Sequence, residues 1–79
     1  MTPKIQPEGE VFGQRLRELR LKRNLTQDAL ADLVATSKPF ISNLERGVKV
    51  PSLTTILRLA EALECRVYDL VKVFDKGSR

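Results

Sequence analysis

Only three residues, 35–37, separate two segments whose apolar side chains recur at the spacing of an α-helix. These two segments are residues 26–34 and residues 38–46. Ser37 can cap the second helix, and Pro39 falls in its first turn, where a missing N–H leaves no hydrogen bond unmade. Because three residues allow only a tight corner, we expect the two helices to pack against each other at a steep angle.

Three further helices are predicted around this pair. Residues 11–24 carry a helical apolar stripe, Ser52 can cap a fourth helix, and residues 67–74 form a short fifth one. No segment alternates apolar and polar residues as a half-buried strand does. The sequence therefore predicts an all-α fold, a compact five-helix bundle. The expected inner faces are Phe12, Leu16 and Leu19 in the first helix, Leu30, Leu33 and Val34 in the second, Ile41 and Leu44 in the third, and Leu53, Ile56, Leu57, Ala60 and Leu63 in the fourth.

The two ends of the chain differ in composition from the predicted bundle. Residues 1–10 contain two prolines and Gly9 with few apolar side chains, which predicts a flexible arm. The bundle is expected over residues 11–74, with the closely joined helix pair at residues 26–46. Residues 75–79 are short and polar, so we expect them to form a frayed tail.

The side-chain inventory argues against several classes of function. The 79 residues include one Cys and no His, so the chain lacks an internal disulfide, the usual four Cys or His ligands of a zinc site, and a histidine general base. We expect no enzyme, no metal, no cofactor and no small-molecule ligand. No apolar run approaches the roughly 20 residues of a membrane span, and no signal-peptide pattern is present, which predicts a cytoplasmic protein without a membrane partner. The formal net charge of +4 permits nucleic-acid binding.

The segment TQDALADLVATSKPFISNLERG has the arrangement of a helix-turn-helix, in which the second helix enters the major groove of DNA. The chain resembles the phage-repressor/Cro-like helix-turn-helix family, which includes small bacterial regulators and restriction–modification controller proteins. The resemblance extends from Phe12 to about Val71 and includes the later stretch PSLTTILRLAEAL. It implies a transcriptional regulator that binds a pseudo-palindromic operator in double-stranded DNA as a homodimer. The matching positions are Arg20, Leu25, Thr26, Gln27, Leu30, Ala31, Ile41, Ser42, Glu45, Arg46 and Gly47.

The same resemblance implies roles for individual residues. Arg20 and Glu45 match a structural ion pair that ties the first helix to the end of the third. Gln27 matches a residue that contacts a phosphate and braces the recognition helix, residues 38–46. The positions that would face the bases are Ser37, Lys38, Phe40 and Asn43, and those that would approach phosphates are Thr26, Gln27, Arg46, Lys49 and Ser52.

The chemistry of several of these side chains leaves alternatives open. Lys38 can donate to guanine O6 and N7, or it can contact a phosphate without base preference. Asn43 can pair with adenine N6 and N7 or hold only bound water. Phe40 can pack on thymine methyl groups or belong to the core. Arg15, Arg17 and Arg23 are expected on a solvated helix face, with phosphate contacts as the alternative.

Two positions depart from the family pattern. Ala35 and Glu64 stand where the family often has Gly, at turns that can require a positive φ. Ala35 therefore predicts a different turn or modest strain of about 1 kcal/mol, and Glu64 predicts a weaker end to the fourth helix. Beside it, Cys65 is expected to be a buried packing thiol, with an exposed redox-sensing thiolate as the alternative.

The last helix carries more apolar side chains than a single buried stripe needs, which predicts a dimer contact. The alternative is that this helix merely closes a small core. The residues expected in the dimer interface are Val67, Leu70, Val71 and Phe74. An antitoxin-like or bridging protein-interaction module is the alternative function from another class, and DNA binding by the isolated chain discriminates between the two.

Overall fold

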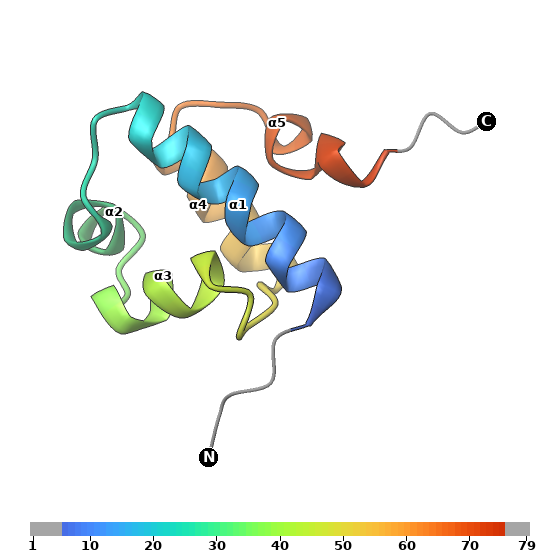
Figure 1. Cartoon of the computed structure of the whole chain (residues 1–79). Helices are drawn as coiled ribbons and strands as arrows, with labels where there is room; N and C mark the ends of the chain where they lie inside the picture. The colour runs from blue at the N-terminus through green and yellow to red at the C-terminus, as the bar shows by residue number, and fades with distance from the viewer. Residues whose placement is uncertain (1–5, 76–79) are drawn as a thin grey trace, which may run out of the picture.

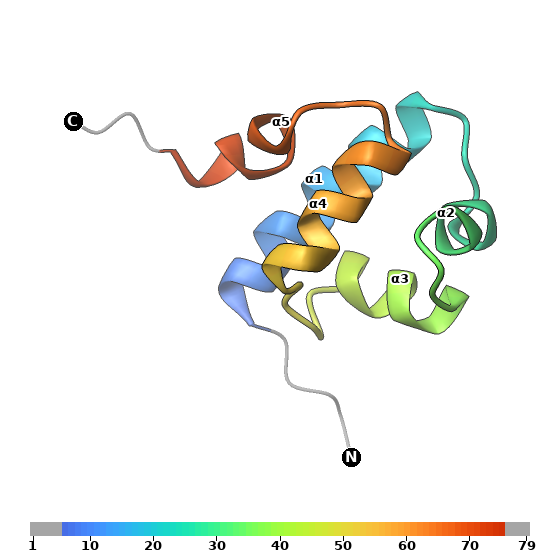
Figure 2. The same cartoon turned by 180° about the vertical axis from the view of Figure 1, so that it is seen from behind.

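The computed structural model describes residues 6–75, which form five α-helices and a terminal 3-10 turn and contain no strand (Figure 1). The elements are α1 (Pro7–Lys22), α2 (Gln27–Leu33), α3 (Lys38–Glu45), α4 (Leu53–Ala62), α5 (Val67–Val71) and η1 (Lys72–Phe74). α2 and α3 lie to one side of α1, and α5 with η1 lies to the other (Figures 1 and 2). The predicted all-α bundle is confirmed.

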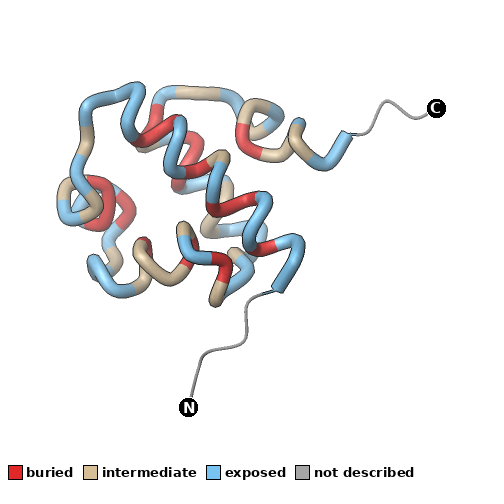
Figure 3. Tube along the Cα trace, in the orientation of Figure 1, coloured by how far each residue is buried: buried red, intermediate tan, exposed pale blue. Residues whose placement is uncertain are grey.

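Every helix contributes apolar side chains to one core. The residues with less than 2% of their surface exposed are Leu16, Leu30, Ile41, Leu44, Leu59, Leu63 and Leu70. Figure 3 shows the buried residues in red, distributed along the helices of the bundle. Burying each such side chain contributes roughly 1.5–3 kcal/mol, so this core fixes α3 relative to α1. Within residues 6–75, no helix is long and apolar enough to cross a membrane.

α1 begins four residues earlier than the sequence predicts, because Pro7 starts the helix and residues 7–10 are helical. Pro is favoured at a first helical position. Gly9 is needed for a close contact: a Cβ there would lie 2.9 Å from the Gly47 carbonyl oxygen. The Gln6 N–H also donates to the Gly47 carbonyl at 3.0 Å. The predicted flexible arm is therefore wrong for residues 7–10, and its residues 1–5, like residues 76–79 of the tail, lie outside the described residues.

Three helices start where their hydroxyl caps predict. The side chains of Thr26, Ser37 and Ser52 accept hydrogen bonds from the third backbone N–H of the following helix, at 3.0, 3.3 and 3.1 Å. Each bond satisfies an N–H that has no partner within the helix. Ser37 caps α3 directly after the turn, and it thereby fixes where the exposed end of α3 begins.

The predicted inner faces of α2 and α4 need correction. Leu33 is 59% exposed, and the small residue Ala31 takes a buried place on α2 instead. Leu53 and Leu57 are 68% and 50% exposed, whereas Leu59 is fully buried. The stripe of α4 that faces the core is Ile56, Leu59, Ala60 and Leu63. A leucine-rich helix offers two overlapping stripes at helical spacing, and the packing of the neighbouring helices selects one of them.

The backbone is left-handed at both positions where the sequence lacks the family's Gly. Ala35 has φ 56° and Glu64 has φ 55°. At Glu64, the side chain of Arg23 supplies compensation: its Nε donates to the Leu63 carbonyl at 2.8 Å and its Nη2 to the Glu64 carbonyl at 2.9 Å. These bonds satisfy carbonyls at the end of α4 that have no partner within the helix. Arg23 is therefore a structural residue, not only part of a solvated face.

Replacing Ala35 with Gly should raise the free energy of unfolding by about 0.5–1 kcal/mol. The relief of left-handed strain, about 1–2 kcal/mol, exceeds the entropic cost of a Gly in the unfolded chain, about 0.4–1 kcal/mol. Urea denaturation measures the difference. The control is Ala29→Gly inside α2, where an ordinary helical position should lose about 1 kcal/mol. Equal losses in both variants would show that Ala35 is not strained.

Candidate nucleic-acid interface

α3 turns one face to the core and the other to solvent. Ile41 and Leu44 are fully buried, whereas Ser37, Lys38 and Pro39 at its N-terminal end are exposed. The first turn of α3 therefore projects from the surface, while its inner residues anchor the helix. This exposed turn is the part that the sequence places in a DNA groove.

The residues expected to face the bases differ in what they already contact. Lys38 is exposed, and within residues 6–75 its side chain has no hydrogen bond or ion pair. Ser37 is occupied as a cap through its hydroxyl oxygen. Asn43 is half-buried, and its Oδ1 accepts a hydrogen bond from Arg46 Nη1 at 3.1 Å. Phe40 is half-buried and packs against the core, which is the alternative that the sequence left open.

The residues expected to approach phosphates lie at the starts of α2 and α4 and in the loop after α3. Thr26, Arg46, Lys49 and Ser52 are exposed. Lys49 has no ion-pair partner in the part of the chain that the structure describes. Gln27 is half-buried, and its Nε2 donates to Glu45 Oε1 at 3.1 Å. The bracing contact expected of Gln27 is thus present within the protein.

Arg20 and Glu45 form the expected ion pair. Arg20 Nε donates to Glu45 Oε2 at 2.6 Å and Nη2 donates to Oε1 at 3.1 Å, so the contact is bidentate. The Arg20 and Glu45 side chains are 9% and 3% exposed. Arg20 Nη1 also donates to the Leu25 carbonyl at 2.7 Å. With the Gln27 amide on the same carboxylate, this network joins α1, α2 and the end of α3.

Glycine allows α1 and α3 to approach closely beside this ion pair. A Cβ at Gly13 would lie 2.4 Å from the Leu44 carbonyl oxygen and 2.5 Å from that of Glu45. Neither neighbour is a flexible side chain that could move aside, so only Gly fits at this position. The ion pair and the glycine contact together hold the C-terminal half of α3 against α1, and leave its N-terminal turn exposed.

Residues 16–70 match the sequence profile of the helix-turn-helix family. The chain belongs to this family of transcriptional regulators. The matched region includes α2, α3 and the ion pair between Arg20 and Glu45.

Relatives in the helix-turn-helix family include a protein of similar size. The chain is 37% identical over 62 residues to the control protein C.BamHI of Bacillus amyloliquefaciens, which covers 77% of this chain and 76% of that protein. It is 42% identical over 59 residues to the helix-turn-helix transcriptional regulator DdrOP3 of Deinococcus deserti, which covers 75% of this chain. The chain spans only 46% of the length of DdrOP3.

Two solved structures of helix-turn-helix regulators superpose on the bundle. The restriction–modification controller protein C.AhdI of Aeromonas hydrophila matches with a TM-score of 0.79 and 40% identity, over 82% of this chain and 98% of that one. The P22 c2 repressor, solved in complex with a synthetic operator, matches with a TM-score of 0.72 and 35% identity, over 78% of this chain and 94% of that one.

Only some of the residues predicted for the dimer contact lie on the surface of this helix-turn-helix protein. Leu70 is fully buried, so its side chain cannot contact a second copy, and its place in the expected interface was wrong. Its position on the inner side of α5 explains the error, because sequence spacing alone did not show which face of this helix meets the core. Val67 and Val71 are half-buried against the same core. Phe74 is 42% exposed, and Tyr68, which was not in the predicted set, is 51% exposed.

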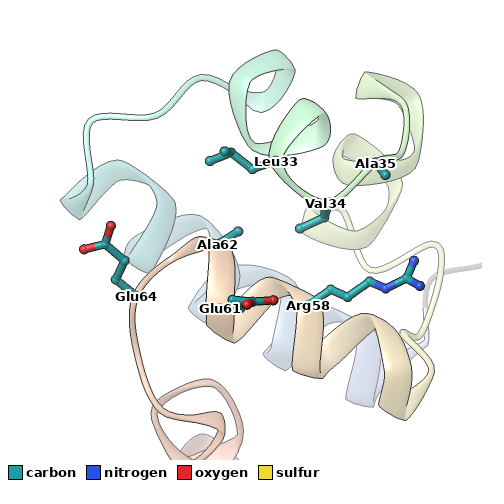
Figure 4. A pocket seen from close by; sticks show the side chains of 7 residues that line it. All are labelled: Leu33, Val34, Ala35, Arg58, Glu61, Ala62 and Glu64. Atoms are coloured by element: carbon teal, nitrogen blue, oxygen red, sulfur yellow. The ribbon is translucent and has the colours of Figure 1, made fainter.

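A hollow of about 530 Å³ lies between α2, the turn and α4 (Figure 4). It is lined by Leu33, Val34, Ala35, Arg58, Glu61, Ala62 and Glu64. None of these residues belongs to the predicted base-contacting or phosphate-contacting sets. Leu33, which is exposed on α2, forms part of the wall of this hollow.

Cys65 should react slowly with thiol reagents in the native protein. Its side chain is half-buried against the core, where burial and the negative charge of Asp69 raise the pKa of the thiol. Because only the thiolate is nucleophilic, we expect labelling by a disulfide reagent at pH 8 to be at least about tenfold slower than in urea. Equal rates in the two conditions would favour the redox-sensor alternative.

Sequence reasoning missed two kinds of residue that build this interface. Gly13 was not recognised as the contact that lets α1 approach α3, nor Gly9 as its contact with the loop after α3, although their four-residue spacing puts them on one helix face. Arg15 was expected on a solvated face, but its Nε donates to the Asp69 carbonyl at 2.7 Å. The spacing of the two glycines is visible in the sequence, whereas no residue type marks a backbone carbonyl that will accept a hydrogen bond from a distant side chain.

Proposed function

We propose that this chain is a sequence-specific double-stranded DNA-binding regulator, which places α3 in the major groove of a pseudo-palindromic operator as a homodimer. The single observation that carries the proposal is the exposed N-terminal turn of α3, which bears the unpaired Lys38 on a helix anchored by Ile41 and Leu44. A major groove about 12 Å wide admits one helix.

The side chains around α3 fall into two groups, one suited to contact bases and the other suited to contact phosphates. Lys38 can donate to O6 and N7 of a guanine, and Asn43 can read an adenine edge after releasing Arg46. Thr26 is the N-cap of α2 and Gln27 is its first residue, while Lys49 lies in the loop after α3 and Ser52 caps α4, so both groups can contact phosphates on either side of the groove. The half-buried Phe40 contributes mainly by packing α3 against the core.

The exposed apolar side chains of the C-terminal segment support the homodimer. Tyr68 and Phe74 are half-exposed on α5 and η1. These elements lie across α1 from α2 and α3, so a contact there leaves the recognition helix unobstructed (Figures 1 and 2). Two recognition helices related by a two-fold axis read half-sites about 34 Å apart.

The experiment that tests this function is selection from random duplex DNA with the purified chain at two salt concentrations. We expect enrichment of two inverted half-sites about one helical turn apart, with affinity that falls at higher salt as phosphate contacts are screened. Binding without any enriched sequence, lost at the higher salt, would contradict the proposal. It would favour the alternative of a protein-interaction module.

A further inference from the structure

α5 is too short to fix its own orientation. It has five residues, and only Leu70 is fully buried. Isolated helices shorter than about 12 residues are marginal in water. The Asp69 carboxylate caps it by accepting the Arg66 N–H at 2.9 Å, a bond within the segment itself that does not tie it to the rest of the bundle. This bond also lowers the pKa of the Asp69 carboxyl group. Contacts from other helices must therefore hold α5 in place.

One arginine of α1 supplies such a contact through a backbone carbonyl. Arg15 Nε donates to the Asp69 carbonyl at 2.7 Å, and Arg15 Nη1 donates to Glu18 Oε1 at 3.1 Å. Arg23, the C-cap residue of α1, donates to the carbonyls of Leu63 and Glu64 at the end of α4, at 2.8 and 2.9 Å. Figures 1 and 2 show the connection from α4 to α5 starting near the C-terminal end of α1. Arg23 thus holds the start of this connection, and Arg15 holds α5 itself.

The Asp69 carbonyl, to which Arg15 donates, belongs to a residue that stands between a buried and an exposed side chain of α5. Asp69 stands between Leu70, which is fully buried, and Tyr68, which is 51% exposed. A charge-assisted hydrogen bond to this carbonyl restricts rotation of the helix about its axis. The direction in which Tyr68 and the following Phe74 point therefore depends on Arg15.

We infer that Arg15 is a positioning residue for the dimer contact, because it sets the orientation in which α5 presents Tyr68 and Phe74 to a second copy of this chain. The inference rests on the proposed homodimer. Arg15 lies outside α2 and α3, and its side chain bonds to neither Arg20 nor Glu45. Loss of the Arg15 contact should therefore weaken dimerisation while each half-site contact is retained.

The test compares Arg15→Met, which keeps the apolar stem, with the matched control Arg17→Met. Arg17 is exposed on the same helix and has no hydrogen bond or ion pair within residues 6–75. Sedimentation equilibrium should show at least a tenfold weaker dimer for Arg15→Met and an unchanged dimer for Arg17→Met. Binding to a duplex with one half-site should change less than twofold in both variants. Amide hydrogen exchange should become faster in α5 and stay unchanged in α3.

Arg15→Lys is the second variant, which keeps the charge and one donor in case Arg15→Met does not fold. It should recover part of the lost dimer affinity. If the wild-type protein is a dimer and both Arg15 variants dimerise with the same affinity, the inference is overturned while the proposed homodimer stands. An equal loss on half-site and full-site DNA would also overturn it, because that would indicate general destabilisation. A wild-type chain that stays monomeric on and off DNA would overturn the proposed homodimer and the inference with it.

Discussion

Glu45→Gln should lower the free energy of unfolding by about 3–5 kcal/mol. The substitution keeps the shape of the side chain but leaves Arg20 buried without a compensating charge. Arg20 is 7% exposed, and its guanidinium donates to both carboxylate oxygens. Because a small domain is stable by only about 5–15 kcal/mol, we expect a large part of the protein to unfold near physiological temperature. Urea denaturation at neutral pH measures the effect.

Glu18→Gln is the matched control, because it removes an exposed carboxylate from an ion pair within α1. The Glu18 side chain is 67% exposed, and its contact with Arg15 is 3.1 Å long. Exposed pairs contribute less than about 1 kcal/mol, so this variant should be nearly as stable as the wild type. Replacing Arg20 and Glu45 together with Met should recover most of the loss. Equal effects of Glu45→Gln and Glu18→Gln would contradict the structural role of the buried pair.

Lys38→Ala should lower the affinity for the selected operator by about 1–3 kcal/mol per half-site and relax the preference at one base pair. The reason is the loss of a donor that is exposed and unpaired in the free protein. Because two copies bind, the effect on the full operator should be about twice as large. Competition binding against operators substituted at single positions measures both the affinity and the preference.

Lys22→Ala provides the control for charge alone. Lys22 is exposed in the last turn of α1, outside the residues expected to contact DNA or a second copy, and its loss changes the net charge by the same amount. We expect little change in affinity and none in sequence preference. If Lys38→Ala lowered the affinity for all sequences equally and kept the wild-type preference, Lys38 would be a phosphate contact, as the sequence also allowed.

Local rules predicted the starts of α2, α3 and α4 well. Thr26, Ser37 and Ser52 each cap the helix that follows, and this depends only on a hydroxyl and the next three residues. At Ala35 the family's Gly left a different turn or modest strain open, and the left-handed backbone there corresponds to the strained alternative. Such features are visible in sequence because all the atoms involved are close along the chain.

Features that depend on distant packing were predicted less well. The spacing of leucines on α4 fits two stripes, and only the contact with other helices selects Leu59 over Leu57 as the buried residue. The early start of α1 depends on Gly47, which lies nearly forty residues beyond Gly9. Within the candidate site, the resemblance pointed to Arg20 and Glu45 as a pair. No such guide existed for arginines that bind backbone carbonyls.

The close contact of α1 with α3 has a consequence for the thermodynamics of association. A backbone that touches its neighbour at Gly13 leaves α3 no room to shift against α1. Little conformational freedom then remains to be lost when the helix meets its target, so the entropic penalty of complex formation falls mainly on side chains such as Lys38. The heat capacity change on binding should accordingly match the apolar area buried by two rigid bodies, without the larger value that accompanies folding of a segment.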